Sequence, residues 1–239
     1  MKFVTAILAS AAFSVSAANA ITFEFEPDSA ASVAINNIIV GGIDYGDITT
    51  VSTNGVNQLI AYNSLPPVGQ DPDLEGPFQN IDNAADIRNG FGNLGIISKN
   101  PAPFTAPNDS ATGGQITFVF DSLVTFDEIT IFDTKNCGKS KCTTVTAFGD
   151  EDGNIQLASQ TITQNLEDSN GTNFFKTLSF GTSLVKMVVV DIKNDSGAID
   201  QLKFATGTNI DQPVPVPGAL PLMLTGAAAF AARRRRRQA

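Results

Sequence analysis

Carboxylates are the most frequent reactive side chains in this sequence, and four of them have the spacing of a calcium-binding loop. Asp71, Asp73, Glu75 and Asp82 occupy positions 1, 3, 5 and 12 of a twelve-residue segment, with Gly76 at position 6. Calcium prefers such clusters of carboxylate and carbonyl oxygens. Prolines at positions 2 and 7, an Asp at position 12 and the lack of flanking helices depart from that pattern. An acidic surface loop with proline-set turns is therefore the alternative.

Asp200 is a second candidate calcium ligand. It has the same strand parity as Leu202 and Phe204, so we expect it to point inward, where a carboxylate needs a partner or a metal. Jelly rolls of the carbohydrate-binding kind often hold a structural calcium between their first and last strands, which makes Glu26 and Asp28 candidate co-ligands. The alternative is an Asp at a strand end that caps a turn.

Catalytic chemistry has little support in the composition. The chain contains no histidine, which excludes Ser-His-Asp and Cys-His catalysis and histidine metal sites. Carboxylate pairs, as in glycoside hydrolysis, remain open. With 24 acidic residues some pair always fits on paper, so we expect no enzyme activity and no catalytic residues.

The two cysteines, Cys137 and Cys142, are separated by four residues, which suits neither a C-x-x-C redox centre nor a zinc knuckle. In an oxidising compartment this spacing predicts a disulfide that closes a hairpin loop and stabilises the fold by about 2 kcal/mol. Two free thiols are the alternative.

The elements that must position these groups are short strands. Period-two alternation, β-branched and aromatic residues and frequent turn residues predict them at 21–25, 33–40, 56–62, 94–98, 115–120, 126–132, 143–148, 155–163, 174–180, 185–192 and 198–204. No stretch of ten residues in this region has helical periodicity. The pattern predicts an all-β fold, an antiparallel two-sheet jelly-roll sandwich over 21–205. The segment 63–92 has no strand signal and is expected to be a long functional, metal-ordered or mobile loop.

The two ends of the chain indicate export. Lys2, the apolar run 3–15 and the small residues Ala18 and Ala20 have the form of a secretory signal over 1–20, cleaved before Ile21. A tether over 206–217 precedes the C-terminal segment 218–239, whose apolar helix is just long enough to cross a thin bilayer. The arginines that follow it would stay in the cytoplasm: Arg233, Arg234, Arg235, Arg236 and Arg237.

All 24 acidic residues lie between these ends, with only nine basic ones, so the domain has a net charge of about −15. This balance argues against nucleic-acid binding, which needs cationic contacts to phosphate. It is typical of a solvated exterior domain or of one that binds cations.

The C-terminal segment resembles the sorting signals of the PEP-CTERM class, and most closely the Val-Pro-Leu-Pro-Ala variant. The resemblance runs from the motif Val214, Pro215, Val216 and Pro217 through the apolar run to the arginines. Val216 and Gly218 stand where the variant usually has Leu and Ala. The resemblance implies recognition by an exosortase-type membrane protease and cleavage near the motif. It further implies an inner-membrane intermediate and delivery to the cell surface or extracellular matrix of a Gram-negative bacterium.

Short motifs over 21–205 resemble uncharacterised secreted sandwich domains that often carry this same tail. They lie at 71–74, 92–97, 113–118 and 196–202. The resemblance implies a galactose-binding-like jelly roll and no established activity. We therefore expect a calcium-stabilised structural or adhesive module, with a glycan-binding module as the alternative and a carboxylate-based hydrolase as the third hypothesis. An extracellular polysaccharide is a candidate partner, although the chain has no Trp and only two Tyr to form a sugar platform.

Overall fold

The structure is all-β over the residues that the computed structural model describes: 20–25, 34–52, 55–65, 72–100, 109–134, 142–166, 173–193 and 196–206. All of them belong to one compact unit, Ala17–Thr206. The elements are β1 (Ala20–Phe23), β2 (Asn37–Val40), β3 (Ile43–Ser52), β4 (Leu59–Asn63), the 3-10 turn η1 (Pro72–Leu74), β5 (Phe78–Asn80), β6 (Asn83–Arg88), β7 (Asn93–Ile97), β8 (Gly113–Phe132), β9 (Thr144–Phe148), β10 (Gln156–Thr161), β11 (Asn173–Lys193) and β12 (Ala198–Thr206).

Apart from Ala20 in β1 and Thr206 in β12, the predicted signal peptide, tether, sorting motif and arginine cluster lie outside the described residues. Within the ranges given above, no helix has the length and hydropathy needed to cross a membrane.

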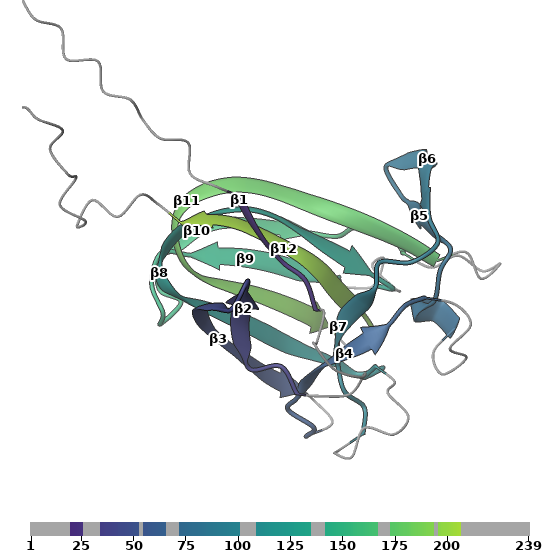
Figure 1. Ribbon diagram of the computed structural model, residues 1–239, viewed down its shortest axis with the longest axis horizontal. Helices are drawn as coiled ribbons and strands as arrows, with labels where there is room; N and C mark the ends of the chain where they lie inside the picture. The colour runs from purple at the N-terminus through teal and green to yellow at the C-terminus, as the bar shows by residue number, and fades with distance from the viewer. Residues whose placement is uncertain are drawn as a thin grey trace, which may run out of the picture. The chain divides into compact units, whose positions relative to one another are not determined.

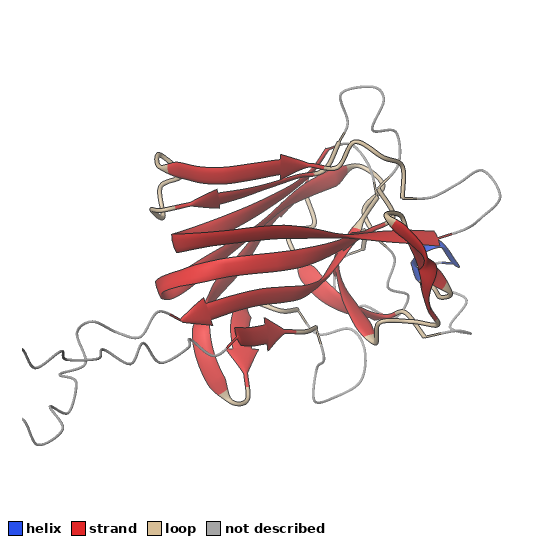
Figure 2. Ribbon diagram, turned by 90° about the horizontal axis from the view of Figure 1, so that it is seen from above, coloured by secondary structure: helices blue, strands red, loops and turns tan. Residues whose placement is uncertain are grey.

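The strands form one continuous sheet that folds back on itself into two layers (Figure 1). The first layer has the order β6-β5-β11-β8-β12-β7-β4, with β1 also beside β12. The second layer has the order β10-β9-β11-β8-β3-β2. Every pairing is antiparallel except the short parallel contact between β5 and β11. Figure 2 shows the long strands side by side from above. The architecture is that of an antiparallel β-sandwich.

Strands β8 and β11 take part in both layers, because each is about twenty residues long and bends near its middle. Their ladder runs from Gly113 opposite Lys193 to Phe132 opposite Phe175, with register shifts between Ser179 and Met187. Such bulges add an unpaired residue and bend the strand. We predicted two strands in place of each, because residues 121–122 and 181 look like turn residues. The structure shows continuous strands that cross from one layer to the other.

The main core fills the space between the layers. The second layer contributes alternating residues such as Ile116, Phe118 and Val190, and the first layer contributes Ile129 and Ile131. Period-two alternation therefore buries one face of second-layer strands such as β9. The Phe rings also occupy this core, as expected, with Phe120 and Phe204 packed at 5.0 Å between centroids.

A smaller second core lies on the outer side of the first layer. Tyr62, Phe78, Phe132 and Phe175 are fully buried there, and Phe91 packs against them. This core corrects the prediction that 63–92 contains no strand, because its described part forms η1, β5 and β6. The short strands have little alternation of their own, and they pack against the Phe132 ring of β8 and the Phe175 ring of β11.

Strand β3 was also missed, because Gly46 and its aspartates resemble a loop. The chain reverses between β2 and β3 at Gly41 and Gly42, whose φ values are 59° and 78°. Two consecutive residues with positive φ make the tight turn that suits a hairpin, and glycine adopts it without strain.

Candidate functional site

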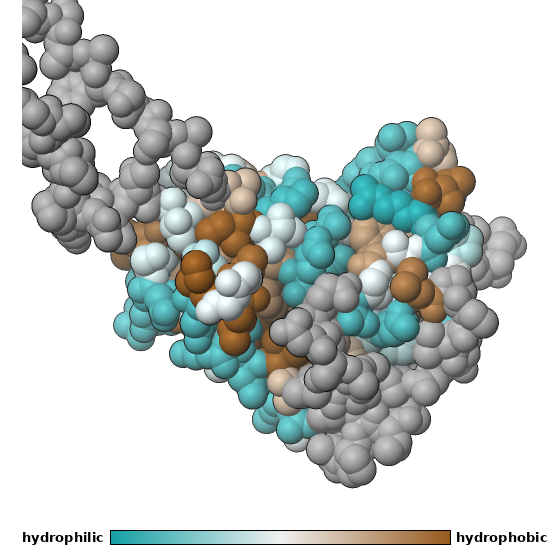
Figure 3. Space-filling model, in the orientation of Figure 1, coloured by the Kyte–Doolittle hydropathy of each residue, from teal (hydrophilic) through white to brown (hydrophobic). Residues whose placement is uncertain are grey.

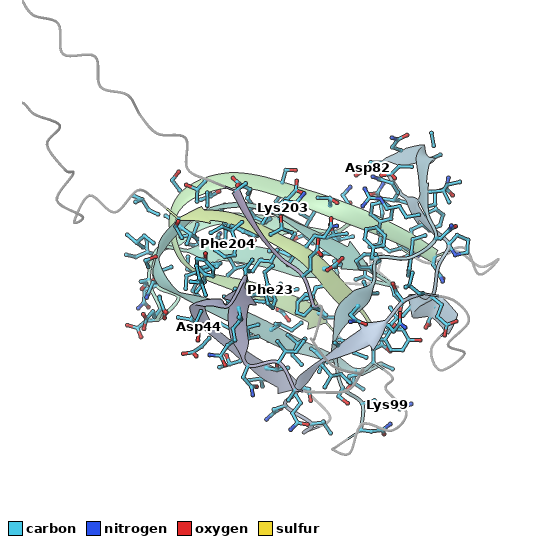
Figure 4. All side chains as sticks on the ribbon, viewed as in Figure 1. Phe23, Asp44, Asp82, Lys99, Lys203 and Phe204 are labelled. Atoms are coloured by element: carbon cyan, nitrogen blue, oxygen red, sulfur yellow. The ribbon has the colours of Figure 1, made fainter. Side chains whose placement is uncertain are left out.

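The carboxylates of the predicted calcium loop are held by different neighbours. Glu75 accepts a hydrogen bond from the Tyr62 hydroxyl at 3.1 Å beside the second core. Asp82 lies at the tip of the β5–β6 hairpin, where it pairs with Lys176 at 3.0 Å (Figure 4). Asp73 lies in η1, and Asp71 is outside the described residues. Among the residues that the structure describes, no three acidic or cysteine side chains gather as a metal site.

Asp200 is buried, with only 1% of its surface exposed, but the parity argument for its direction was wrong. Gln201 has a φ of 51° and the β8–β12 register shifts there, which reverses the alternation. Ile199 and Leu202 consequently both face the main core. Asp200 lies on the other side, opposite Thr130, whose hydroxyl is 3.0 Å from that of Thr177.

The expected proximity of the first and last strands is confirmed. Strand β1 pairs with β12 so that Phe23 lies opposite Leu202. Phe25, two residues beyond the end of β1, packs in the main core. Glu26 and Asp28, the predicted co-ligands, follow directly in sequence but lie outside the described residues.

Two buried carboxylates that we did not single out hold the connection between β11 and β12. Asp133 accepts a hydrogen bond from the Ser196 hydroxyl at 2.7 Å, and Asp109 accepts one from the Gly197 backbone amide at 2.8 Å. All four groups come from segments that meet at one end of β7, β8 and β12. Neither Asp has a distinctive spacing in the sequence, because the three segments that bring them together are distant along the chain. We call these four residues the carboxylate clamp.

Cys142 is half-buried and packs against the main core. Cys137 lies outside the described residues, so the disulfide between them stays a prediction.

Arg88 joins the β5–β6 hairpin to the second core. Its guanidinium lies over the rings of Phe91 and Phe175, 4.8 and 4.9 Å from their centroids. It also donates two hydrogen bonds to Asp86, at 3.1 and 3.2 Å. The hydrogen bonds from Arg88 hold the pKa of the Asp86 carboxyl below its ordinary value. This pair is consistent with a structural role, since both of its charges are used within the hairpin.

The outer side of the second layer presents a broad set of side chains with little charge. The ladder aligns two cross-strand rows of five, from β3 through β8, β11 and β9 to β10. One row is Thr49, Thr117, Val189, Thr146 and Ser159, and the other is Val51, Gln115, Asp191, Thr144 and Thr161. We call these ten residues the hydroxyl face. Six of the ten carry a hydroxyl, and the single charge, Asp191, pairs with Lys193 at 3.3 Å.

Hydrogen bonds within the hydroxyl face orient part of it. The hydroxyl of Thr146 is 3.1 Å from that of Ser159, and the hydroxyl of Thr144 is 3.1 Å from that of Thr161. Neighbouring strands lie about 4.8 Å apart, so a row of five extends about 19 Å. The arrangement can make many hydrogen bonds to a polar surface, but it offers no acid–base pair for catalysis.

Comparison with known proteins finds no matching family model and no matching curated protein. Among solved structures, the K1 cleaved adhesin domain of Lys-gingipain from Porphyromonas gingivalis W83 has a TM-score of 0.36 and 13% identity, over 79% of this chain and 99% of that one. The K2 cleaved adhesin domain of Lys-gingipain has a TM-score of 0.39 and 13% identity, over 79% of this chain and 98% of that one. Similarity at this level carries no argument about function.

Proposed function

We propose that this chain is an exported, non-catalytic β-sandwich module of the jelly-roll kind that makes structural or adhesive contacts at the cell surface or in the extracellular matrix. The observation that carries the proposal is the hydroxyl face. It is nearly free of charge on a domain whose net charge is about −15. An uncharged face can approach another envelope component without like-charge repulsion and can then form hydrogen bonds.

The test is attachment of the secreted protein to envelope and matrix material from the producing cells, measured by co-sedimentation. Thr117→Glu combined with Thr146→Glu places two carboxylates at the centre of the hydroxyl face. We expect attachment at least about tenfold weaker than that of the wild type. Thr22→Glu, on β1 of the other layer, is the matched control and should bind normally. Wild-type attachment by the double variant would refute the role of this face.

Delivery to that location is proposed to depend on the C-terminal sorting signal. The support is the order of the proline motif, apolar run and five arginines in the sequence. An exosortase-type membrane protease would act on the chain while its apolar segment is in the inner membrane. Deletion of 213–239 should release the protein into the medium, as measured by fractionation and immunoblotting. Retention at the surface after this deletion would remove the sorting signal from the proposal.

Calcium is proposed as a stabilising ion held by Asp200 with Glu26 and Asp28. The support is the pairing of β1 with β12, the strand that carries the buried Asp200. The 71–82 segment has less support, because its described carboxylates do not gather. A chelator should lower the Tm of the wild type and leave that of Asp200→Asn unchanged. An unaltered wild-type Tm would exclude calcium.

Glycan binding by the same module is the second candidate, and the hydroxyl and amide groups of the hydroxyl face are the observation that favours it. These groups can exchange hydrogen bonds with sugar hydroxyls, and the described face has no exposed aromatic platform to stack on a ring. A glycan array with the purified domain separates the two candidates. Binding that is lost in the Thr117→Glu, Thr146→Glu variant supports a glycan ligand, and consistent silence favours the structural role.

A further inference from the structure

Two leucines at the bend of β8 and β11 are unusually exposed. Leu123 is 47% exposed and Leu184 is 65% exposed, although most large apolar residues of these strands are buried. Leu184 also has a φ of 62°, a left-handed conformation that a bulky side chain rarely adopts. The folded domain therefore holds a strained, solvent-exposed leucine without burying its side chain. We call Leu123 and Leu184 the apolar tip.

The apolar tip lies at the end of the domain from which the chain continues to its C-terminal segment. Val124 lies opposite Val185 in the β8–β11 ladder and opposite Thr206 in the β8–β12 ladder. Leu123 and Leu184 are therefore next in sequence to a cross-strand row that includes Thr206, the last residue of β12. Across the bend, the hydroxyls of Thr125 and Ser183 are 3.3 Å apart. Figure 1 shows β8 and β11 curving at this end, far from β6.

Another exposed apolar side chain belongs to the same end. The β3–β8 ladder stops at Gly46 opposite Phe120; Gly46 is three residues from Ile43 on β3, and Phe120 is three residues from Leu123 on β8. Ile43 is 57% exposed. In Figure 3, apolar side chains gather on the face over β1 and β2, where the turn to β3 begins.

The two leucines lie in short uncharged stretches of the chain. No charged residue occurs over 122–126 or over 177–185, and the residues that border these stretches are Asp121, Asp127, Lys176 and Lys186. The flanking Lys186 is occupied by Glu151 at 2.8 Å and by the backbone carbonyl of Asp121 at 3.1 Å. Leucines in such uncharged stretches can insert at the headgroup boundary of a bilayer, and neutral headgroups do not repel the bordering carboxylates.

The length of chain beyond Thr206 favours a lipid bilayer as the partner of the apolar tip. Only 11 residues, 207–217, separate the end of β12 from the apolar segment 218–232. Even fully extended, they reach at most about 40 Å. Whenever the apolar segment is in a bilayer, the apolar tip is therefore on the part of the domain tethered nearest to it. Two copies of a domain with a net charge of about −15 would instead repel each other.

We infer that the apolar tip docks on the phospholipid bilayer while the C-terminal segment is inserted, which orients the domain before release. This inference rests on the proposed function, because it requires that the C-terminal segment enters a membrane. It also accounts for the strain at Leu184, since lipid contact provides the burial that the domain itself does not.

The absence of tryptophan from the chain makes a direct test possible. Leu123→Trp and Leu184→Trp each place a single Trp in the full-length chain, which is reconstituted into phosphatidylcholine vesicles with or without brominated acyl chains. Bromine quenches a Trp that enters the lipid, so we expect emission to fall at least about twofold at both positions. Ile87→Trp is the matched control, because Ile87 is 61% exposed and lies on β6; its emission should not change.

The outcomes separate the two proposals. If the protein floats with the vesicles but neither tip Trp is quenched, the docking inference is wrong and the membrane segment stands. If the wild type does not float with the vesicles, both the docking inference and the proposed membrane insertion of the C-terminal segment are wrong. A change in emission that depends on protein concentration and not on bromine would indicate a second copy at the apolar tip and would overturn the inference. Leu123→Trp keeps the test valid if Leu184→Trp misfolds, because Leu123 has no positive φ.

Discussion

Gly46 is the position at which the structure makes its sharpest prediction about stability. It lies in β3 with a φ of 143°, where the strand passes close to β8. A Cβ atom at this position would lie 2.0 Å from the carbonyl oxygen of Val119 and 2.8 Å from the Cα of Phe120. Ordinary carbon–oxygen contacts begin at about 3.3 Å. Gly46→Ala therefore forces β3 away from β8 by about 1.3 Å, because both clashing atoms belong to the backbone.

The expected loss of stability has two parts. Separation of the strands breaks about two ladder hydrogen bonds, each worth about 1 kcal/mol, and the backbone conformation adds about 1–3 kcal/mol of strain to any residue except glycine. Gly46→Ala should therefore lower the free energy of unfolding by about 3–5 kcal/mol, a large part of the total for a typical domain. Guanidinium chloride unfolding followed by circular dichroism measures this change.

Gly42→Ala is the matched control for this experiment. Gly42 has a φ of 78° and no atom within 4 Å of its ideal Cβ position, so only the conformational strain applies. We expect that variant to lose about 1–2 kcal/mol. If Gly46→Ala is no less stable than Gly42→Ala, the close approach of β3 to β8 is not a property of the protein, and the hydroxyl face would lack the β3 end of its rows.

Three other predictions concern the carboxylate clamp, the β5–β6 hairpin and the cysteines. Asp109→Ala leaves the buried Gly197 amide without its acceptor and should lower the free energy of unfolding by about 1.5–3 kcal/mol. Asp109→Asn keeps an acceptor oxygen and should lose less stability. If both variants have the thermal stability of the wild type, the carboxylate clamp is contradicted. Arg88→Gln should raise the pKa of Asp86 toward its ordinary value of 3.8, as followed by NMR titration of the carboxyl, and an unchanged pKa would disprove the pairing. Because the folded-state pKa of Asp86 is lowered, the contribution of this pair to stability is present at neutral pH and disappears as the pH falls through that pKa. A reductant should lower the free energy of unfolding of the wild type by about 2 kcal/mol if the two cysteines form a disulfide, and no change would mean that they do not.

Several features of the fold were predictable from local pattern alone. Alternation along residues such as Ile129, Ile131, Val188 and Val190 predicted strands with one buried face, and the structure buries all four of these side chains. The pattern was sufficient because period-two alternation is a property of the strand itself and requires no knowledge of its partners. The charge balance could likewise be read from composition, whereas the two terminal signals, which rest on short contiguous motifs, stay predictions.

Three other features depended on contacts between distant segments. Whether residues 121–122 and 181 end a strand or bend it was decided by the β8–β11 ladder, which continues across both positions. The side of the sheet that Asp200 occupies was decided by the bulge at Gln201, a register effect that parity counting cannot detect.

The carboxylate clamp is the third such feature. Asp109, Asp133 and Ser196 are spread over 88 positions of the chain and are joined only when β7, β8 and β12 end together. The sequence by itself thus determined most of the strands and the charge, because each is a local property, and the two terminal signals stay predictions of the same local kind. Tertiary structure alone decided the bend, the burial of the acidic groups and the apolar tip, because register and layer packing are set by partners distant in the chain.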